Sequence, residues 1–232
     1  AIVTGVTLVV TINQLVLSQE LGAAGDQRER LDGALEFRQS VADTLDAPVS
    51  PQDPAAFLRA IVEATTDRAR NIDDTVGTAV SEDLATALDD YVATVTDHGE
   101  AVVGKLEGAS FGSFSVVEAA LDYNYSWKLA EARRLRSVGA DELSTEALDA
   151  LEDIEELLEH FAVGREHVKT LYFQWELIDL SRGMLVTAIP ALLTSIGMIL
   201  FVDVPGSFPG ATLGLDHTVL VVAAGTSVAL VP

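Results

Sequence analysis

Residues 145–202 read TEALDALEDIEELLEHFAVGREHVKTLYFQWELIDLSRGMLVTAIPALLTSIGMILFV, and this stretch predicts one long helix. The first two thirds are polar and acidic, whereas no charged residue occurs from Met184 to Val202. At about 1.5 Å of rise per residue, the apolar part is long enough for a hydrocarbon core of ~30 Å. We therefore expect a helix that leaves an acidic domain and enters a membrane without a break.

The composition separates charge from hydrophobicity along the chain. The formal charge is −22, from 36 Asp and Glu against 14 Lys and Arg, yet the mean hydropathy is positive. Every Lys and Arg lies between Arg28 and Arg182, together with nearly all of the acids. An acidic domain joined to nearly charge-free membrane spans produces this mixture.

The expected fold class is all-α, an integral membrane protein whose transmembrane helices continue into a long acidic helical bundle or stalk. Both ends of the chain lie inside apolar runs, so we expect an ordered fragment of a longer protein. The predicted segments are a truncated transmembrane helix 1–17, an acidic soluble helical domain 18–182, a transmembrane helix 183–202, a Pro/Gly loop 203–216 and a truncated transmembrane helix 217–232.

The distribution of basic residues predicts the orientation. Arg28, Arg30, Lys169 and Arg182 flank the spans on the domain side, whereas the 203–216 loop has no Lys or Arg. The positive-inside rule then places the acidic domain in the cytoplasm of a multi-pass protein of the cell membrane.

The acidity itself is typical of proteins from salt-loving archaea, with an ordinary acidic surface as the alternative. Lysine occurs only at Lys105, Lys128 and Lys169. At molar salt the Debye length is only about 3 Å, so dense carboxylates repel one another little. A strongly acidic surface disfavours nucleic-acid binding, and the absence of cysteine excludes disulfides and thiolate chemistry.

Capping signals divide the domain into helices. Asp53 followed by Pro54 predicts a helix start, and Ser81 begins the next helix. Ser115 and Glu118 form a capping-box pattern ahead of a single helix that we expect to end at Gly139.

Two residue patterns are candidate functional faces. Both follow steps of three and four, so each lies on one side of a helix. The first-span polar stripe either lines an aqueous path or packs between helices, and it contains Thr4, Thr7, Thr11, Gln14 and Ser18. The second-span small-residue face favours close helix packing, and it contains Gly183, Thr187, Pro190, Thr194 and Gly197.

Signatures of catalysis are absent from the sequence. We find no phosphate-binding glycine loop, no G-x-S-x-G and no H-E-x-x-H. Glu156 and His160 lie one helical turn apart, but a di-metal site needs a matching motif on a second helix, and an acidic solvated face is the simpler interpretation. We therefore expect no enzyme activity, no catalytic residues, no metal and no cofactor.

Three stretches carry a resemblance: TINQLVLSQELG, FAVGREHVKTLYFQWEL and LSRGMLVTAIPALL. They resemble a family of haloarchaeal multi-span membrane proteins that has no assigned activity. The general layout, with spans beside a large helical mass, is also similar to that of bestrophin-like channels, although no channel motif supports that analogy.

These observations favour two functions. The first is a homo-oligomeric ion channel or transport pore, in which the polar stripe of 1–17 would face water. The second is a membrane-anchored sensory or interaction module with a cytoplasmic helical stalk. The expected partners are the lipid bilayer and further copies of the chain.

Overall fold

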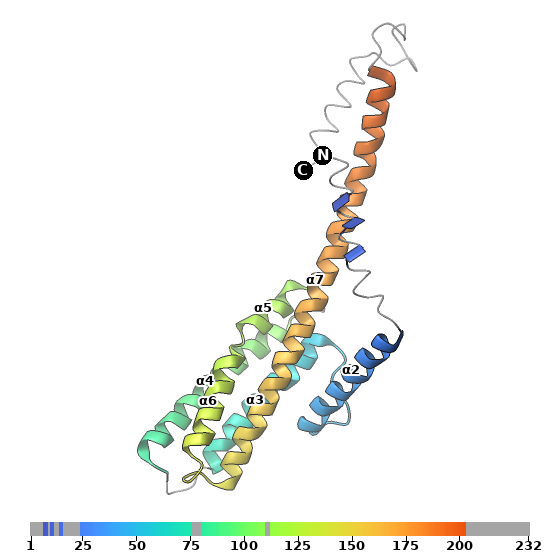
Figure 1. Cartoon of the computed structure of the whole chain (residues 1–232). Helices are drawn as coiled ribbons and strands as arrows, with labels where there is room; N and C mark the ends of the chain where they lie inside the picture. The colour runs from blue at the N-terminus through green and yellow to red at the C-terminus, as the bar shows by residue number, and fades with distance from the viewer. Residues whose placement is uncertain are drawn as a thin grey trace. The chain divides into compact units, whose positions relative to one another are not determined.

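A computed structural model describes residues 7–8, 10–11, 14–15, 24–75, 80–109 and 112–202. The labelled elements in this part of the chain are helices (Figure 1). Their bounds are α2 Ala24–Thr44, α3 Pro54–Thr75, α4 Glu82–Glu107, α5 Phe114–Asp122, α6 Tyr125–Val138 and α7 Thr145–Val202.

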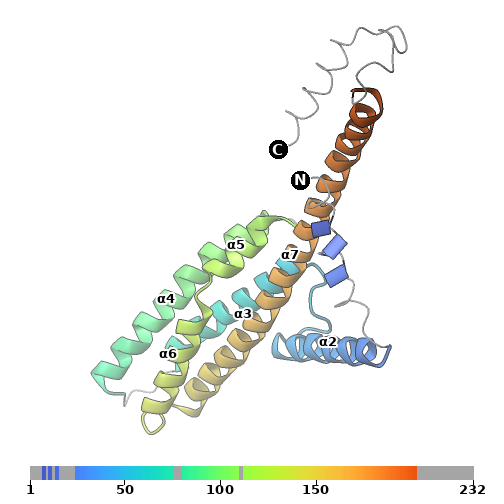
Figure 2. The ribbon, with the colours of Figure 1, turned by 45° about the horizontal axis from the view of Figure 1, so that its top comes forward.

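The chain divides into two compact units. One comprises residues 24–173, and the other combines 1–23 with 174–232. The first unit is a helical bundle made of α2 to α6 and the first half of α7. Within it α4 packs against α3, α5 and α6, as two views of the ribbon show (Figures 1 and 2).

The bundle core follows the apolar periodicity of its helices. On α7, Leu151, Ile154, Leu158 and Phe161 recur every three to four residues and are fully buried. Each such side chain contributes roughly 1.5–3 kcal/mol by leaving water. The matching face of α4 is also buried, and it includes Leu84, Leu88, Tyr91, Val92, Val95, Val102 and Leu106.

The start of α3 confirms the capping prediction. The Asp53 carboxylate oxygen Oδ1 accepts a hydrogen bond from the backbone N–H of Ala56 at 2.9 Å. The Asp53 carbonyl accepts from the N–H of Phe57 at 2.8 Å, which begins the helical ladder. Pro54 has no backbone N–H, but no helical hydrogen bond is lost at this position, because the first N–H groups of a helix have no acceptor within the helix.

The predicted single helix from Ser115 to Gly139 is wrong. The chain leaves helical geometry at Tyr123, and the Asn124 side chain accepts from the N–H of Trp127 to start α6. The N-cap of α5 is Ser113, whose hydroxyl lies 2.6 Å from that of Ser115, so the expected capping box does not form. Asparagine is a strong N-cap residue, which favours a break at this point.

The expected integral membrane architecture is also wrong. In the part of the chain that the structure describes, no helix has a segment long and apolar enough to cross a membrane. Asp179 and Glu176 interrupt the apolar character one and two turns before Arg182.

This correction extends to the interpretations that depended on the spans. The multi-pass location in the cell membrane, with a cytoplasmic acidic domain, and the ion-channel interpretation are therefore no longer supported. The predicted spans 217–232 and most of 1–17, together with the loop 203–216, lie outside the described residues.

Candidate functional site

An apolar cavity of about 390 Å³ lies between α2, the segment that leads into α3, and α7. Its size falls within the usual range for small-molecule sites, which are mostly apolar with a few polar groups. We call it the apolar cavity, and it is lined by Gly33, Ala34, Phe37, Arg38, Gln52, Pro54, Phe57, Val163, Gly164, His167, Val168 and Leu171.

Gly164 sets the approach of α7 to α3 at this cavity. A Cβ atom at Gly164 would lie 3.0 Å from Cε1 of Phe57 and 3.2 Å from Cδ2 of Leu58. Any larger residue would therefore push the Phe57 ring. That ring packs against Phe37 of α2 with centroids 6.0 Å apart, so two aromatic rings in contact form one part of the cavity wall.

Arg38 is the main polar group of the apolar cavity. Its Nη2 atom donates to the carbonyls of Pro51 at 2.6 Å and Ser50 at 3.3 Å, which ties the α2–α3 connection to α2. Its guanidinium carbon lies 5.6 Å from the centre of the Phe57 ring, within cation–π range. No carboxylate among the described residues pairs with Arg38.

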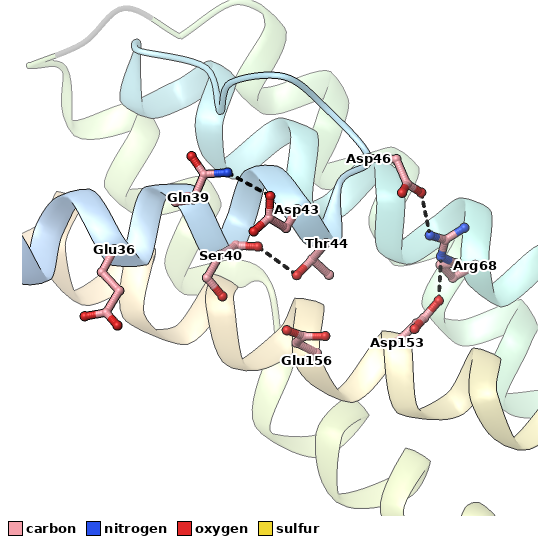
Figure 3. A pocket seen from close by; sticks show the side chains of 9 residues that line it. All are labelled: Glu36, Gln39, Ser40, Asp43, Thr44, Asp46, Arg68, Asp153 and Glu156. Atoms are coloured by element: carbon pink, nitrogen blue, oxygen red, sulfur yellow. Dashed lines mark hydrogen bonds and ion pairs between the residues drawn. The ribbon is translucent and has the colours of Figure 1, made fainter.

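A second, larger cavity of about 700 Å³ is acidic, and we call it the acidic cavity (Figure 3). Much of its lining is already paired: Arg68 contacts Asp46 at 3.2 Å and Asp153 at 3.0 Å, and Gln39 donates to Asp43 at 2.8 Å. Because these side chains bind one another, fewer polar groups of the acidic cavity are available to bind a ligand. The full lining is Glu36, Gln39, Ser40, Asp43, Thr44, Asp46, Arg68, Asp153 and Glu156.

His160 connects the linings of the two cavities. Its Nε2 atom lies 3.3 Å from the Ser40 hydroxyl and 3.2 Å from the Thr44 hydroxyl, both in the acidic cavity. Its ring meets Phe37 of the apolar cavity edge-on, with centroids 5.7 Å apart. Burial lowers the pKa of His160, while the nearby charge of Glu156 opposes that shift. His160 is therefore held as a neutral, packed imidazole near neutral pH.

The sequence-predicted pair Glu156 and His160 forms a contact of 3.6 Å. Nearby Glu159 instead pairs with Arg133, and Glu166 pairs with Arg165 and Lys169. Within the described ranges, no three His, Asp or Glu side chains are grouped as metal ligands would be.

A buried lysine lies elsewhere in the bundle. Lys128 of α6 is fully buried, and its Nζ donates to Nδ1 of His98 on α4 at 2.8 Å. The Nζ atom also lies 4.4 Å from the centre of the Tyr123 ring. Burial lowers the pKa of Lys128 to about 8. This arrangement makes Lys128 an internal proton-binding group with which no carboxylate of the described ranges forms an ion pair.

The predicted polar stripe is described only in part. The Thr11 hydroxyl donates to the Thr7 carbonyl at 2.8 Å, and Thr7, Thr11 and Gln14 are exposed. Thr4 and Ser18 lie outside the described residues. The pairing within one helix does not decide between helix packing and contact with water, so the stripe stays a prediction.

The predicted small-residue face lies on α7. The Thr187 hydroxyl lies 3.2 Å from the Gly183 carbonyl and 3.0 Å from that of Met184, to which it donates. Nothing lies within 4 Å of a Cβ built on Gly183. The Thr194 side chain and the surroundings of Gly197 fall outside the described set, so close packing on this face also stays a prediction.

Sequence reasoning missed the apolar cavity because its walls come from three separate segments, 33–38, 52–57 and 163–171. No local pattern marks their meeting. It also missed Lys128, although a signal was present: Lys128, Ala132 and Leu135 share one face of α6 by their spacing, and all three are buried.

Comparisons with known proteins identify a family for this chain but no characterised relative. A search of curated proteins and a search of solved structures each return no match. One family model matches residues 1–232, which confirms the resemblance to a family without assigned activity. The chain belongs to DUF7972, a family of unknown function.

Proposed function

We propose that the chain is a sensory or interaction module that binds a small apolar molecule in the apolar cavity, and that it is not an enzyme. The observation that carries this proposal is the cavity itself: about 390 Å³, walled by Phe37, Phe57, Val168 and Leu171, with polar groups at few positions. A concave apolar site with few directed polar groups suits binding better than catalysis.

The helices around the cavity suit a sensory role. The connection between α2 and α3 is held by Arg38, a residue of the wall, through the carbonyls of Ser50 and Pro51. A ligand that moves Arg38 therefore changes the hydrogen bonds of the connecting segment. A ligand in the cavity would also contact α7, which continues to Val202.

The test is the binding of N-phenyl-1-naphthylamine, an uncharged dye that fluoresces in apolar sites. We expect the wild-type chain to bind it, and Ala34→Trp to abolish the signal because the indole fills the cavity. The matched control is Ala93→Trp on the exposed face of α4, which should bind as the wild type does. Equal binding by wild type and Ala34→Trp would overturn the proposal.

We also propose that the family works at high salt, as the resemblance to haloarchaeal proteins suggests. Many of the basic residues of the bundle are paired with carboxylates, as in Arg70 with Asp67 and Glu100. The excess of acids is thus left to hydration and counter-ions. The same charge supports the proposal that nucleic acid is not a partner.

A second candidate function is self-association through the later part of α7. Large apolar side chains there are exposed, including Trp175, Ile178, Leu185 and Ile189. Patches of this kind commonly mark interfaces. Light scattering at high salt should give a dimer or larger, and Ile178→Glu should reduce it to a monomer. A monomeric wild-type chain would contradict this second proposal.

A further inference from the structure

We propose that the ligand of the apolar cavity is an apolar monocarboxylate, a chain or ring compound with one carboxylate, and that Arg38 binds its head group. This inference rests on the proposed binding function and specifies its chemistry. It is carried by the charges of the cavity lining and by the Arg38 guanidinium, with which no carboxylate of the described residues pairs.

The charge of the apolar cavity is opposite to that of the protein. The chain has 36 Asp and Glu, but none of them lines this cavity. Its titratable lining residues are Arg38 and His167. The acidic cavity, by contrast, is lined by the carboxylates of Glu36, Asp43, Asp46, Asp153 and Glu156. Of these two cavities, the apolar cavity is therefore the one that attracts an anion.

Arg38 has donors to spare. Its two hydrogen bonds to protein both use Nη2, so Nε and Nη1 donate to no acceptor among the described residues. Other arginines of the bundle pair with carboxylates, as Arg28 does with Asp32 and Arg59 with Glu63. Both parallel forks of a guanidinium include Nη2, which is already used, so Nε and Nη1 each offer one separate charge-assisted bond; the charge still makes a carboxylate the expected partner.

The rest of the wall selects an apolar body for this anion. Phe37, Phe57, Val163, Val168 and Leu171 present aromatic and branched side chains. The Phe57 ring also holds the Arg38 guanidinium in place, at 5.6 Å from its centre. A small hydrophilic anion such as acetate would gain the Arg38 contact but would leave these apolar surfaces uncovered.

The first experiment compares matched ligands on the wild-type protein. Decanoate, decan-1-ol and decyltrimethylammonium share one alkyl chain and differ in head-group charge. Their dissociation constants are measured by calorimetry at neutral pH, at the lowest salt concentration at which circular dichroism shows the chain to be folded, because screening at higher salt weakens the ion pair. We expect the dissociation constant of decanoate to be at least about 10-fold lower than that of decan-1-ol, because only the carboxylate forms a charge-assisted hydrogen bond with Arg38. The cationic ligand should bind most weakly.

The second experiment changes the head-group contact. Arg38→Gln should weaken decanoate about 10-fold or more and leave decan-1-ol unchanged. Arg38→Lys keeps the charge but not the placed Nε and Nη1 donors, so it should restore part of the decanoate affinity. The matched control is Arg28→Gln, also on α2 but outside the cavity lining, which should change neither ligand.

The outcomes separate this inference from the binding function. If decan-1-ol binds as tightly as decanoate and Ala34→Trp blocks both, the cavity binds apolar molecules but the carboxylate inference is overturned. If none of the three ligands binds and the uncharged dye also fails, the binding function is overturned. Should Arg38→Gln fail to fold, the comparison of the three ligands on the wild type still decides the question.

Discussion

The Nζ atom of Lys128 lies 2.8 Å from Nδ1 of His98, and no carboxylate among the described residues neutralises this buried charge. Tyr91 donates its hydroxyl to the Lys128 backbone carbonyl, a bond that does not depend on the side chain. Burial, and then the charge of Lys128, lower the pKa of His98. Near neutral pH the pair therefore carries one positive charge, on Lys128, and folding must desolvate this ammonium.

The first prediction concerns the pH dependence of stability. The pKa of Lys128 is about 8 in the folded chain and near 10.4 in the unfolded chain. At a pH between these two values, the Lys128 amine is therefore protonated more fully in the unfolded chain than in the folded one. The Lys128 contribution to stability is then least favourable below pH 8 and improves as the pH rises toward 10. Lys128→Met should be about 1–3 kcal/mol more stable than wild type at pH 7, with the difference shrinking by pH 9.5.

Urea denaturation at several pH values measures this difference. Burial raises the pKa of Tyr91 and Tyr123, which destabilises every variant at high pH, so only differences from wild type are compared. The control is Lys105→Met, since Lys105 is exposed and pairs with Asp122. A Lys128→Met variant less stable than wild type at pH 7 would contradict the prediction.

The second prediction concerns a buried carboxylate between α6 and α7. Glu155 is 7% exposed, and its Oε2 accepts from Nε of Arg133 at 3.2 Å and Nη2 of Arg136 at 3.3 Å. Glu155→Gln should lower the free energy of unfolding by about 1–3 kcal/mol, because it weakens two charge-assisted hydrogen bonds at a buried site. Glu152, which pairs with Arg136 but is 69% exposed, provides the control, and Glu152→Gln should change stability little. Equal effects of the two changes would show that burial of Glu155 is unimportant.

The third prediction concerns the cap of α3. Asp53→Ala removes the acceptor for the Ala56 N–H and should cost about 1 kcal/mol in thermal or chemical unfolding. Ser113 occupies the same N-cap position on α5 but its side chain makes no cap hydrogen bond, so Ser113→Ala should cost much less. A larger loss for Ser113→Ala would refute the role assigned to Asp53.

The fourth prediction concerns salt. With a formal charge of −22, the folded chain repels itself more than the expanded chain does, so screening should favour folding. We expect the unfolding midpoint to rise as KCl increases from about 0.1 M to about 2 M, where the Debye length becomes very short. A midpoint that stays flat or falls over this range would argue against a protein adapted to salt.

The sequence predicted the helices of the bundle better than it predicted their assembly. Asp53–Pro54 marked a real helix start because side-chain capping depends on a few neighbouring residues. Ser81 also stands at the N-cap of α4, although its side chain makes no cap hydrogen bond. The break at Tyr123 was missed because apolar periodicity continues across it, and a single Asn124 cap decides the geometry.

The membrane prediction rested on the charge-free run after Arg182. It is wrong because no helix in the described part of the chain is long and apolar enough to cross a membrane. The apolar cavity shows the opposite limit. Phe57 and Gly164 meet across 107 positions of sequence, and no local pattern predicts such a meeting.

The contact of Ser40 with His160 has a kinetic consequence. The two residues are 120 positions apart, so no local closure brings α2 to α7. The helices between them must first be assembled, and we expect α2 to dock last, with the apolar cavity forming only at that final step. Pulsed hydrogen exchange should then show protection in α3 and α4 before α2. A ligand of the cavity would accordingly slow unfolding while leaving the early stages of refolding at their own rate.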